Sequence, residues 1–290
     1  MGLRTKFNLV MLATFLVGLG IAGALSYLLE TGSARSQVLK EAEILHAQAS
    51  AMGQYTIDEV APLLAGQFSR RFLPQSVAAW ATQTTFRTVQ QQLPDYSFRA
   101  VVTNPTNPAD RPADWEAELI ERLRHDPGLK ELVTERDTPT GRILSVAHPI
   151  VITNAACMRC HTSPAEAPAT LVDLYGPTNG FGWKLNEVLG AQIVSVPMRV
   201  PFERAYQTFL QVIAWLTLVF VVMSLMLNLL LNYIILRPVG CISALADEVG
   251  LGNMDAPELV VRGKDEIALL AESFNRMRRS LAKTMKMLEE

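Results

Sequence analysis

Charge and cysteine are both scarce in this chain of 290 residues. Only 19% of the residues are charged and 49% are hydrophobic, whereas a soluble domain usually has about 25% charged residues. The 26 basic residues do not outnumber the 28 acidic ones, and this lack of a basic surplus argues against nucleic acid as a partner. Three cysteines are too few for a disulfide-stabilised scaffold. The composition excludes a soluble enzyme and indicates a chain that lies partly in a membrane.

The hydrophobic residues are concentrated in two uncharged runs. Phe7–Leu29 has 23 residues and Ala205–Leu236 has 32. Each run exceeds the roughly 20 residues that a helix needs to cross the hydrocarbon core of a bilayer. We therefore predict transmembrane helices over 7–29 and 208–236. The first run could instead be a signal peptide, because small residues at 22–24 resemble a cleavage site, but its length favours an uncleaved anchor.

The two predicted membrane helices divide the rest of the chain into a short N-terminus (1–6), a central domain (30–207) and a tail (237–290). The central domain contains both helical periodicity and runs in which β-branched residues alternate with smaller or polar ones. This mixture predicts an α+β domain with a small antiparallel sheet. The predicted helices cover 36–64, 76–93 and 113–124, and the predicted strands cover 98–103, 143–152 and 190–198.

The strongest chemical signal is the CMRCH sequence formed by Cys157, Cys160 and His161. This pattern is the attachment signature of c-type haem, in which two thiols become thioethers and the adjacent imidazole binds the iron. A redox-active dithiol or a disulfide would explain the cysteines but not the histidine. A tetrahedral zinc site would need further ligands, and the chain has no second cysteine pair. We predict one covalently attached haem c per chain, with His161 as the proximal ligand.

A second axial ligand would have to come from another histidine or a methionine. We favour His46, because small residues share its face of the predicted helix and leave room for a flat porphyrin. Met52 is the alternative on the same helix. His148 lies nine residues before Cys157, so the chain would have to fold over the haem edge to bring it to the iron. A histidine on an apolar helix face is also often a plain packing residue.

The haem propionates would need a cationic partner. Arg142 follows a glycine and could pair with a propionate through charge-assisted hydrogen bonds. Arg70, Arg71 and Arg99 compete for the same role. Because haem is attached covalently outside the cytoplasmic membrane, we expect a two-pass inner-membrane protein. Its central domain would be periplasmic and both of its termini cytoplasmic.

The tail begins with Arg237 and Pro238, where a proline suits the first turn of a helix. Apolar residues then recur at spacings of three and four on two successive segments. Two short helices cannot bury both seams alone, but a homodimer with four helices would. The seam residues are Ile242, Leu245 and Val249 on the first segment, and Ile267, Leu270, Phe274, Met277 and Leu281 on the second.

The tail resembles a HAMP linker, in the proline after the membrane span and in the string DEIALLAESFNRM. The central domain resembles the c-type haem-binding, PAS-like periplasmic sensor domains. The matching strings are YTIDEVAPLL, DTPTGR, CMRCH and YGPTNGFGWKLNEVLGAQIVSVPM. These resemblances imply a signal-transduction sensor. Relatives often carry a kinase, cyclase or chemotaxis output after the HAMP segment, whereas this sequence stops at the second HAMP helix, so we expect a partner in trans.

Two classes of function fit these features. In the first, the haem detects redox state or a small gas such as NO, CO or O2, and the domain switches the cytoplasmic bundle. In the second, the chain is a membrane-anchored monohaem cytochrome c for electron transfer. The HAMP-like tail favours the sensor, because an electron carrier needs no cytoplasmic heptads. No constellation of nucleophile, base or metal ligands is legible elsewhere, so we expect no enzymatic activity.

Overall fold

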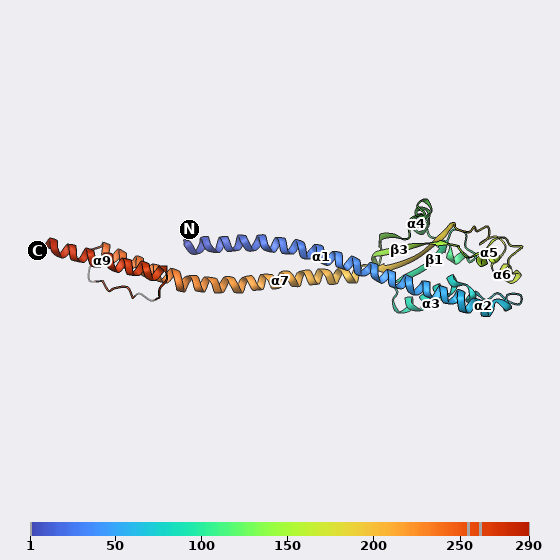
Figure 1. The fold of residues 1–290 in the computed structure, drawn as a ribbon, viewed down its shortest axis with the longest axis horizontal. Helices are drawn as coiled ribbons and strands as arrows, with labels where there is room; N and C mark the ends of the chain where they lie inside the picture. Colours follow the sequence, from blue (N-terminus) through green and yellow to red (C-terminus); the bar gives the residue numbers. More distant parts are fainter. Residues whose placement is uncertain (1, 254–255, 261–262, 290) are drawn as a thin grey trace. The chain divides into compact units, whose positions relative to one another are not determined.

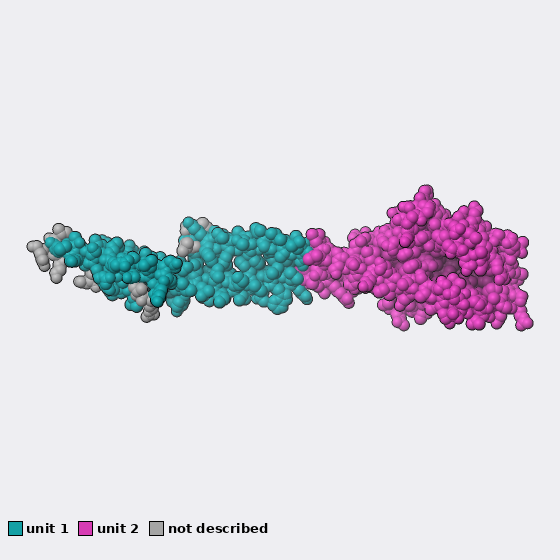
Figure 2. Space-filling model, viewed as in Figure 1, with its two compact units in different colours: residues 1–26, 210–290 teal, residues 27–209 magenta. Residues whose placement is uncertain are grey.

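The computed structural model describes residues 2–253, 256–260 and 263–289. The chain divides into two compact units, shown in different colours in Figure 2. Unit 1 combines residues 1–26 with 210–290, and unit 2 consists of residues 27–209. Two long helices contribute to both units, namely α1 (Leu3–Tyr55) and α7 (Arg199–Leu230). The stretches at 4–67 and 199–250 are each long and apolar enough to cross a membrane.

Helix α1 is continuous over 53 residues, which corrects the prediction of a separate helix beginning at residue 36. The intervening segment ETGSAR contains no proline. Its single glycine, Gly32, costs only about 1 kcal/mol in a helix interior and does not interrupt the hydrogen-bond ladder. A π-helical turn, η1 (Thr56–Val60), follows α1 and leads into α2 (Ala61–Leu64) and the 3-10 turn η2 (Ala65–Gln67).

Unit 2 contains a four-stranded antiparallel sheet in the order β1-β4-β3-β2, which confirms the predicted sheet. The strands are β1 (Ser97–Val102), β2 (Leu132–Thr138), β3 (Gly141–Val151) and β4 (Val188–Pro197). Three of them agree with the predicted strands to within about two residues. Strand β2 was not predicted because it is an edge strand, LVTERDT, in which only the first residue is buried.

Helices cover both faces of this sheet (Figure 1). One face packs against α1 and α3 (Ala78–Gln92), and the other packs against α4 (Asp114–His125). The alternation along each strand explains the two layers, since neighbouring side chains point to opposite faces. The first core contains Val38, Ala42, Phe86, Phe98, Leu144, Val146, Val194 and Val196, and the second contains Val101, Leu119, Ile120, Leu123, Ala147 and Ile193.

The connection from β3 to β4 carries the CMRCH sequence. It contains the 3-10 turn η5 (Ala155–Cys157), the single-turn helix α5 (Met158–His161) and α6 (Ala169–Tyr175). Two further 3-10 turns lie elsewhere in unit 2. The turn η3 (Pro74–Ser76) precedes α3, and η4 (Pro108–Asp110) follows β1. These short elements were not predicted, because each is shorter than the periodic pattern that marks a longer helix.

In unit 1, α7 continues through the π-helical turn η6 (Leu231–Leu236) into α8 (Arg237–Gly250), and α9 (Glu266–Glu289) follows a connector. Leu245 and Val249 of α8 pack with Phe274 of α9 in a small core. The side-chain amide of Asn275 donates to the carbonyl of Leu259 at 2.9 Å and accepts from its N–H at 3.1 Å. The connector is thereby fastened to α9.

Candidate haem site

The two motif cysteines lie within one helical turn. Cys157 ends η5 and Cys160 belongs to α5, and both are half-buried free thiols. Asn154 fixes the start of this turn, because its side chain accepts a hydrogen bond from the N–H of Ala156 at 2.9 Å. Burial raises the pKa of both thiols. A reactive dithiol needs a lowered pKa, so the surroundings argue against a thioredoxin-like role.

His161 is held by a hydrogen bond and by a stacking contact. Its Nδ1 lies 2.7 Å from the carbonyl oxygen of Gly180, and its ring stacks on the indole of Trp183 with centroids 3.7 Å apart and planes 4° apart. Burial lowers the pKa of His161, although the bond to Gly180 opposes this effect. A neutral imidazole that donates from Nδ1 leaves Nε2 free as a metal ligand. His161 therefore has the orientation and protonation state that an iron ligand requires.

Gly180 is required at its position. Its φ is +82°, and an added Cβ would collide with Thr106. The N–H of Gly180 donates to Oδ1 of Asn104 at 3.1 Å, and the indole of Trp183 donates to the Asn104 carbonyl at 3.1 Å. Asn104 thus ties the loop after β1 to the loop that supports His161.

Sequence reasoning missed Gly180, Trp183 and Asn104, because they lie far from His161 along the chain. The string NGFGW, with two glycines beside a tryptophan, was the available signal. Both of its glycines, at 180 and 182, adopt positive φ angles in the structure.

His46 and His148 meet in unit 2, although about 100 residues separate them in the sequence. Their rings stack with centroids 3.7 Å apart and planes 15° apart. Nδ1 of His46 and Nε2 of His148 are buried and have no hydrogen-bond partner in the part of the chain that the structure describes. Burial lowers the pKa of His46 to about 4, and the neighbouring His148 contributes a smaller part of this effect. His46 is therefore neutral at pH 7 and has a nitrogen available for a ligand bond.

The reason given for His46 from the sequence needs correction. Ala42 and Ala49 lie in the core beneath the sheet, and a Cβ on Gly53 would lie 3.6 Å from Thr82 of α3. These small residues make room for neighbouring protein elements and not for a porphyrin. Met52, the alternative ligand, is half-buried on α1.

Arg142, the predicted partner of a propionate, lies far along β3 from the motif. Arg142 stands near the start of β3, whereas the CMRCH sequence follows the other end of that strand. Val151 lies nine positions after Arg142 on β3, a distance of roughly 30 Å at about 3.3 Å per residue. Arg142 pairs instead with Asp137, with 3.1 Å between Nε and Oδ1.

The competing arginines differ in position. Arg99 is engaged with the buried Glu116, with 3.4 Å between Nε and Oε1. Arg70 and Arg71 are exposed, and they follow Phe68, whose carbonyl accepts a hydrogen bond from Thr170 of α6 at 2.6 Å. This bond joins the turn after η2 to the segment that contains the motif. Arg70 and Arg71 therefore lie at the same end of the sheet as CMRCH.

The surface of unit 2 is hollowed between the layer of α1 and α3 and the segment that carries α5, as a comparison of Figures 1 and 2 shows. His46 comes from α1 and His161 from α5, so this hollow lies between the elements that carry the two predicted ligands. Among the described residues, Nδ1 of His46 has no hydrogen-bond partner and the hydrogen bonds of His161 go to its Nδ1, so Nδ1 of His46 and Nε2 of His161 are both suited to iron. The donors present, two thiols and two imidazoles, therefore fit a haem.

Two family models match parts of this chain. No curated protein matches the chain. Among solved structures, it is similar to the crystal structure of the cyanobacterial haem protein Tll0287, with 16% sequence identity and a TM-score of 0.44. That similarity covers 55% of this chain and 94% of the other. A HAMP domain model matches residues 230–283. The Tll0287-like model matches residues 31–197, which is more than half of the sequence, and the chain therefore belongs to the Tll0287-like family.

Proposed function

We propose that this protein is a transmembrane sensor. Its PAS-like central domain would carry one covalently attached haem c in the periplasm, and its HAMP domain would transmit the state of that domain to a cytoplasmic partner. The observation that carries this proposal is the setting of His161. Its ring is fixed by Gly180 and Trp183 with Nε2 free, and it lies in one helical turn with two half-buried thiols.

Each part of the motif has a defined role in holding the haem. Cys157 and Cys160 would each add their S–H across a vinyl double bond, so that sulfur bonds to one carbon and hydrogen to the other. His161 would bind the iron through Nε2. Arg70 and Arg71 would pair with the propionates. When bound, haem supplies an iron that changes oxidation state or takes up a small gas.

His46 is the distal ligand in this proposal, and its position suggests how a signal would start. Its unpartnered Nδ1 and lowered pKa favour a bond to iron, because a protonated imidazole cannot be a ligand. His46 lies on α1, which runs without interruption from the predicted membrane span. A change in the bond to His46 would therefore act on a membrane helix directly. His148 and Met52 are the alternatives.

The predicted membrane segments of unit 1 contact each other through specific side chains. Asn228 of α7 donates to Oδ1 of Asn8 of α1 at 2.8 Å, and Phe15 stacks on Phe220 with centroids 3.8 Å apart. Hydrogen bonds between polar side chains favour helix association in lipid. A displacement of α1 would therefore reach α7, which leads into the HAMP domain through η6.

The HAMP domain would act as a homodimer. Leu270, Met277 and Leu281 of α9 are 44–52% exposed in the single chain. A second copy would bury them in a parallel four-helix bundle, and two packings of that bundle would give the two signalling states. The partner that responds to them would be a kinase, a cyclase or a similar cytoplasmic protein.

The proposal is tested by crosslinking the full chain in membranes. Single cysteines replace Met277 or Leu281 in a Cys241→Ser background, and Arg279→Cys serves as the matched control outside the seam. A bismaleimide reagent then reports proximity with the haem oxidised and reduced. We expect efficient crosslinks at 277 and 281 that change with haem state, and weak crosslinks at 279 in both states. Crosslinks at 277 and 281 that are equally efficient with oxidised and reduced haem would contradict the proposed sensor function and favour a membrane-anchored cytochrome.

A further inference from the structure

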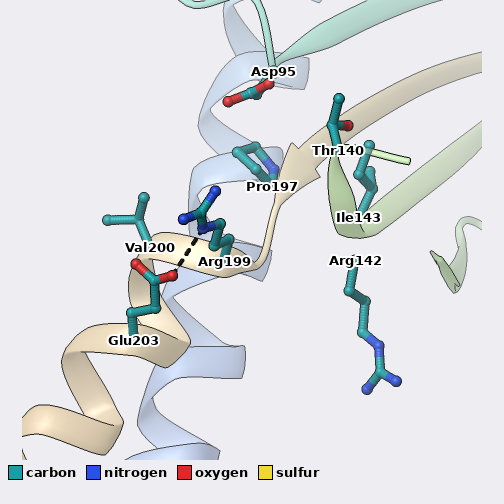
Figure 3. A pocket seen from close by; sticks show the side chains of 8 residues that line it. All are labelled: Asp95, Thr140, Arg142, Ile143, Pro197, Arg199, Val200 and Glu203. Carbon is teal, nitrogen blue, oxygen red and sulfur yellow. Dashed lines mark hydrogen bonds and ion pairs between the residues drawn. The ribbon is translucent and has the colours of Figure 1, made fainter. Parts of the chain in front are cut away.

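Two adjoining hollows lie in unit 2, where β4 ends and α7 begins. Their volumes are about 270 and 470 Å³, and both are lined by Arg142, Arg199 and Glu203. The first also includes Asp95, and the second includes Phe202 and Tyr206. We call this continuous feature the α7 groove. Figure 3 shows its first part, with the side chains of Arg199 and Glu203 projecting from successive turns at the start of α7.

The α7 groove presents charges of both signs. Arg199 pairs with Glu203, with 2.8 Å between Nε and Oε1, and the charge of Asp95 also acts on it. Arg142 extends away from Asp95 and Glu203 (Figure 3), and it pairs with Asp137. The arginine side chains are 71% and 58% exposed. Such exposed pairs contribute about 0–1 kcal/mol, so each arginine can exchange its carboxylate for another anion at little cost.

One end of the groove has the character of a membrane interface. The uncharged apolar run of α7 begins at Ala205, two residues after Glu203. Tyr206 lies in the groove and is 58% exposed. Its ring is 6.4 Å from that of Phe209, which packs edge-on against Tyr27 of α1 at 6.1 Å. Tyrosines collect at the level of the lipid headgroups, so the groove opens at headgroup depth.

We propose that the α7 groove binds the headgroup of a phospholipid that carries both a phosphate and a primary ammonium group, in the outer leaflet of the membrane. The guanidinium of Arg199 would donate to the phosphate, and the exposed side chain of Arg142 would leave Asp137 and turn toward the groove to donate to the same group. The ammonium would donate to Asp95 and Glu203, and the glycerol with the first methylenes would cover Phe202 and Tyr206. This inference rests on the membrane topology proposed above and is independent of haem.

The pairing of charges excludes two other lipid classes as the preferred occupant. An anionic headgroup without an amine would leave both carboxylates facing a negative charge. A choline headgroup has a phosphate, but its methylated nitrogen has no N–H to donate. The groove should therefore distinguish ethanolamine lipid from choline and glycerol lipids.

The test measures which lipids the full chain retains. The protein is reconstituted in an equal mixture of phosphatidylethanolamine, phosphatidylcholine and phosphatidylglycerol, and bound lipid is identified by native mass spectrometry after mild detergent extraction. We expect ethanolamine lipid to be enriched about two- to fivefold, the range that exposed ion pairs provide. Arg142→Gln/Arg199→Gln should abolish the enrichment. Arg204→Gln is the matched control, because it changes a neighbouring arginine of α7 outside the groove, and it should retain the enrichment.

A second variant tests the groove independently if the arginine variant fails to fold. Asp95→Asn/Glu203→Gln should shift the preference toward phosphatidylglycerol, because the two negative charges that attract the ammonium are removed. Equal retention of ethanolamine and choline lipid by the unmodified chain would overturn the proposal, as would a loss in Arg204→Gln as large as in the double variant. The absorption spectrum of the same samples reports the haem separately. A chain without haem that still selects ethanolamine lipid would contradict the proposed function and support the groove.

Discussion

The two histidine sites of unit 2 differ in how completely the protein satisfies them. Nδ1 of His161 is hydrogen-bonded to the carbonyl of Gly180, and its ring stacks on Trp183. His46 and His148 stack on each other while one buried nitrogen of each has no partner among the described residues. A buried unsatisfied nitrogen costs about 1–3 kcal/mol. The contrast indicates one ligand that the fold has already positioned and one site that is incomplete until a further group binds.

The largest effect is expected from removing the positioned ligand. His161→Ala should keep the covalent haem, because both thioethers remain, but it should abolish the spectrum of the axially ligated iron. Absorption and electron paramagnetic resonance spectra of the purified full chain measure this change. His125→Ala is the control, because His125 is exposed and its Nδ1 contacts the Glu121 carbonyl of its own helix at 2.8 Å. An unchanged spectrum in His161→Ala would contradict the assignment.

The next effect concerns the incomplete site. His46→Ala should convert a low-spin haem spectrum into a high-spin one, while His148→Ala should leave the iron low-spin. Both variants are measured by the same spectroscopy. If His148→Ala is the variant that becomes high-spin, His148 and not His46 is the second iron ligand. Low-spin spectra in both would transfer the role to Met52. A high-spin spectrum in the unmodified chain would indicate an open iron site and favour gas sensing.

A smaller effect should come from the support of His161. Gly180→Ala places a Cβ against Thr106 and displaces the carbonyl that orients the imidazole. Loss of such a supporting bond typically weakens ligation about 10- to 100-fold. The strength of this ligation is measured by the concentration of added imidazole that displaces His161 from the iron. Gly182→Ala is the matched control, because Gly182 has a similar φ of +76° but open space around an added Cβ. Equal effects of both would mean that backbone strain, and not the hydrogen bond, is responsible.

The smallest effect concerns stability in the absence of haem. Burial lowers the pKa of His46 from the ordinary histidine value of 6.5 to about 4, so the unfolded chain binds more protons than the folded chain between these values. The stability contributed by neutral His46 is present above pH 6.5 and is lost as the pH falls toward 4. Melting temperatures of the Cys157→Ala/Cys160→Ala chain in detergent should therefore fall over this range. His46→Leu should flatten the dependence, and an equally steep profile in that variant would assign the protons to other groups.

Local patterns of the sequence predicted much of the fold, and contacts between distant segments account for what was missed. Runs in which β-branched residues alternate with smaller or polar ones identified β1, β3 and β4, although β3 and β4 also have continuous buried runs because helices cover both faces of the sheet. Strand β2 was not predicted because its sequence, LVTERDT, is mostly polar and lacks an alternation of apolar and polar residues. The five residues of CMRCH predicted a haem site because its chemistry is local. The meeting of His46 with His148, and of His161 with Gly180, depends on how the sheet and the loops fold, and no local spacing encodes it.

The central claim is that CMRCH holds a covalent haem, and the mass of the intact chain tests it most directly. The full chain and its Cys157→Ala/Cys160→Ala variant are produced in cells that mature c-type cytochromes, and both are measured under denaturing conditions. Our account predicts that the unmodified chain is heavier than its sequence by the mass of one haem and that the variant has the mass of its sequence alone. An unmodified chain without that added mass, or a variant that retains it, would contradict the account.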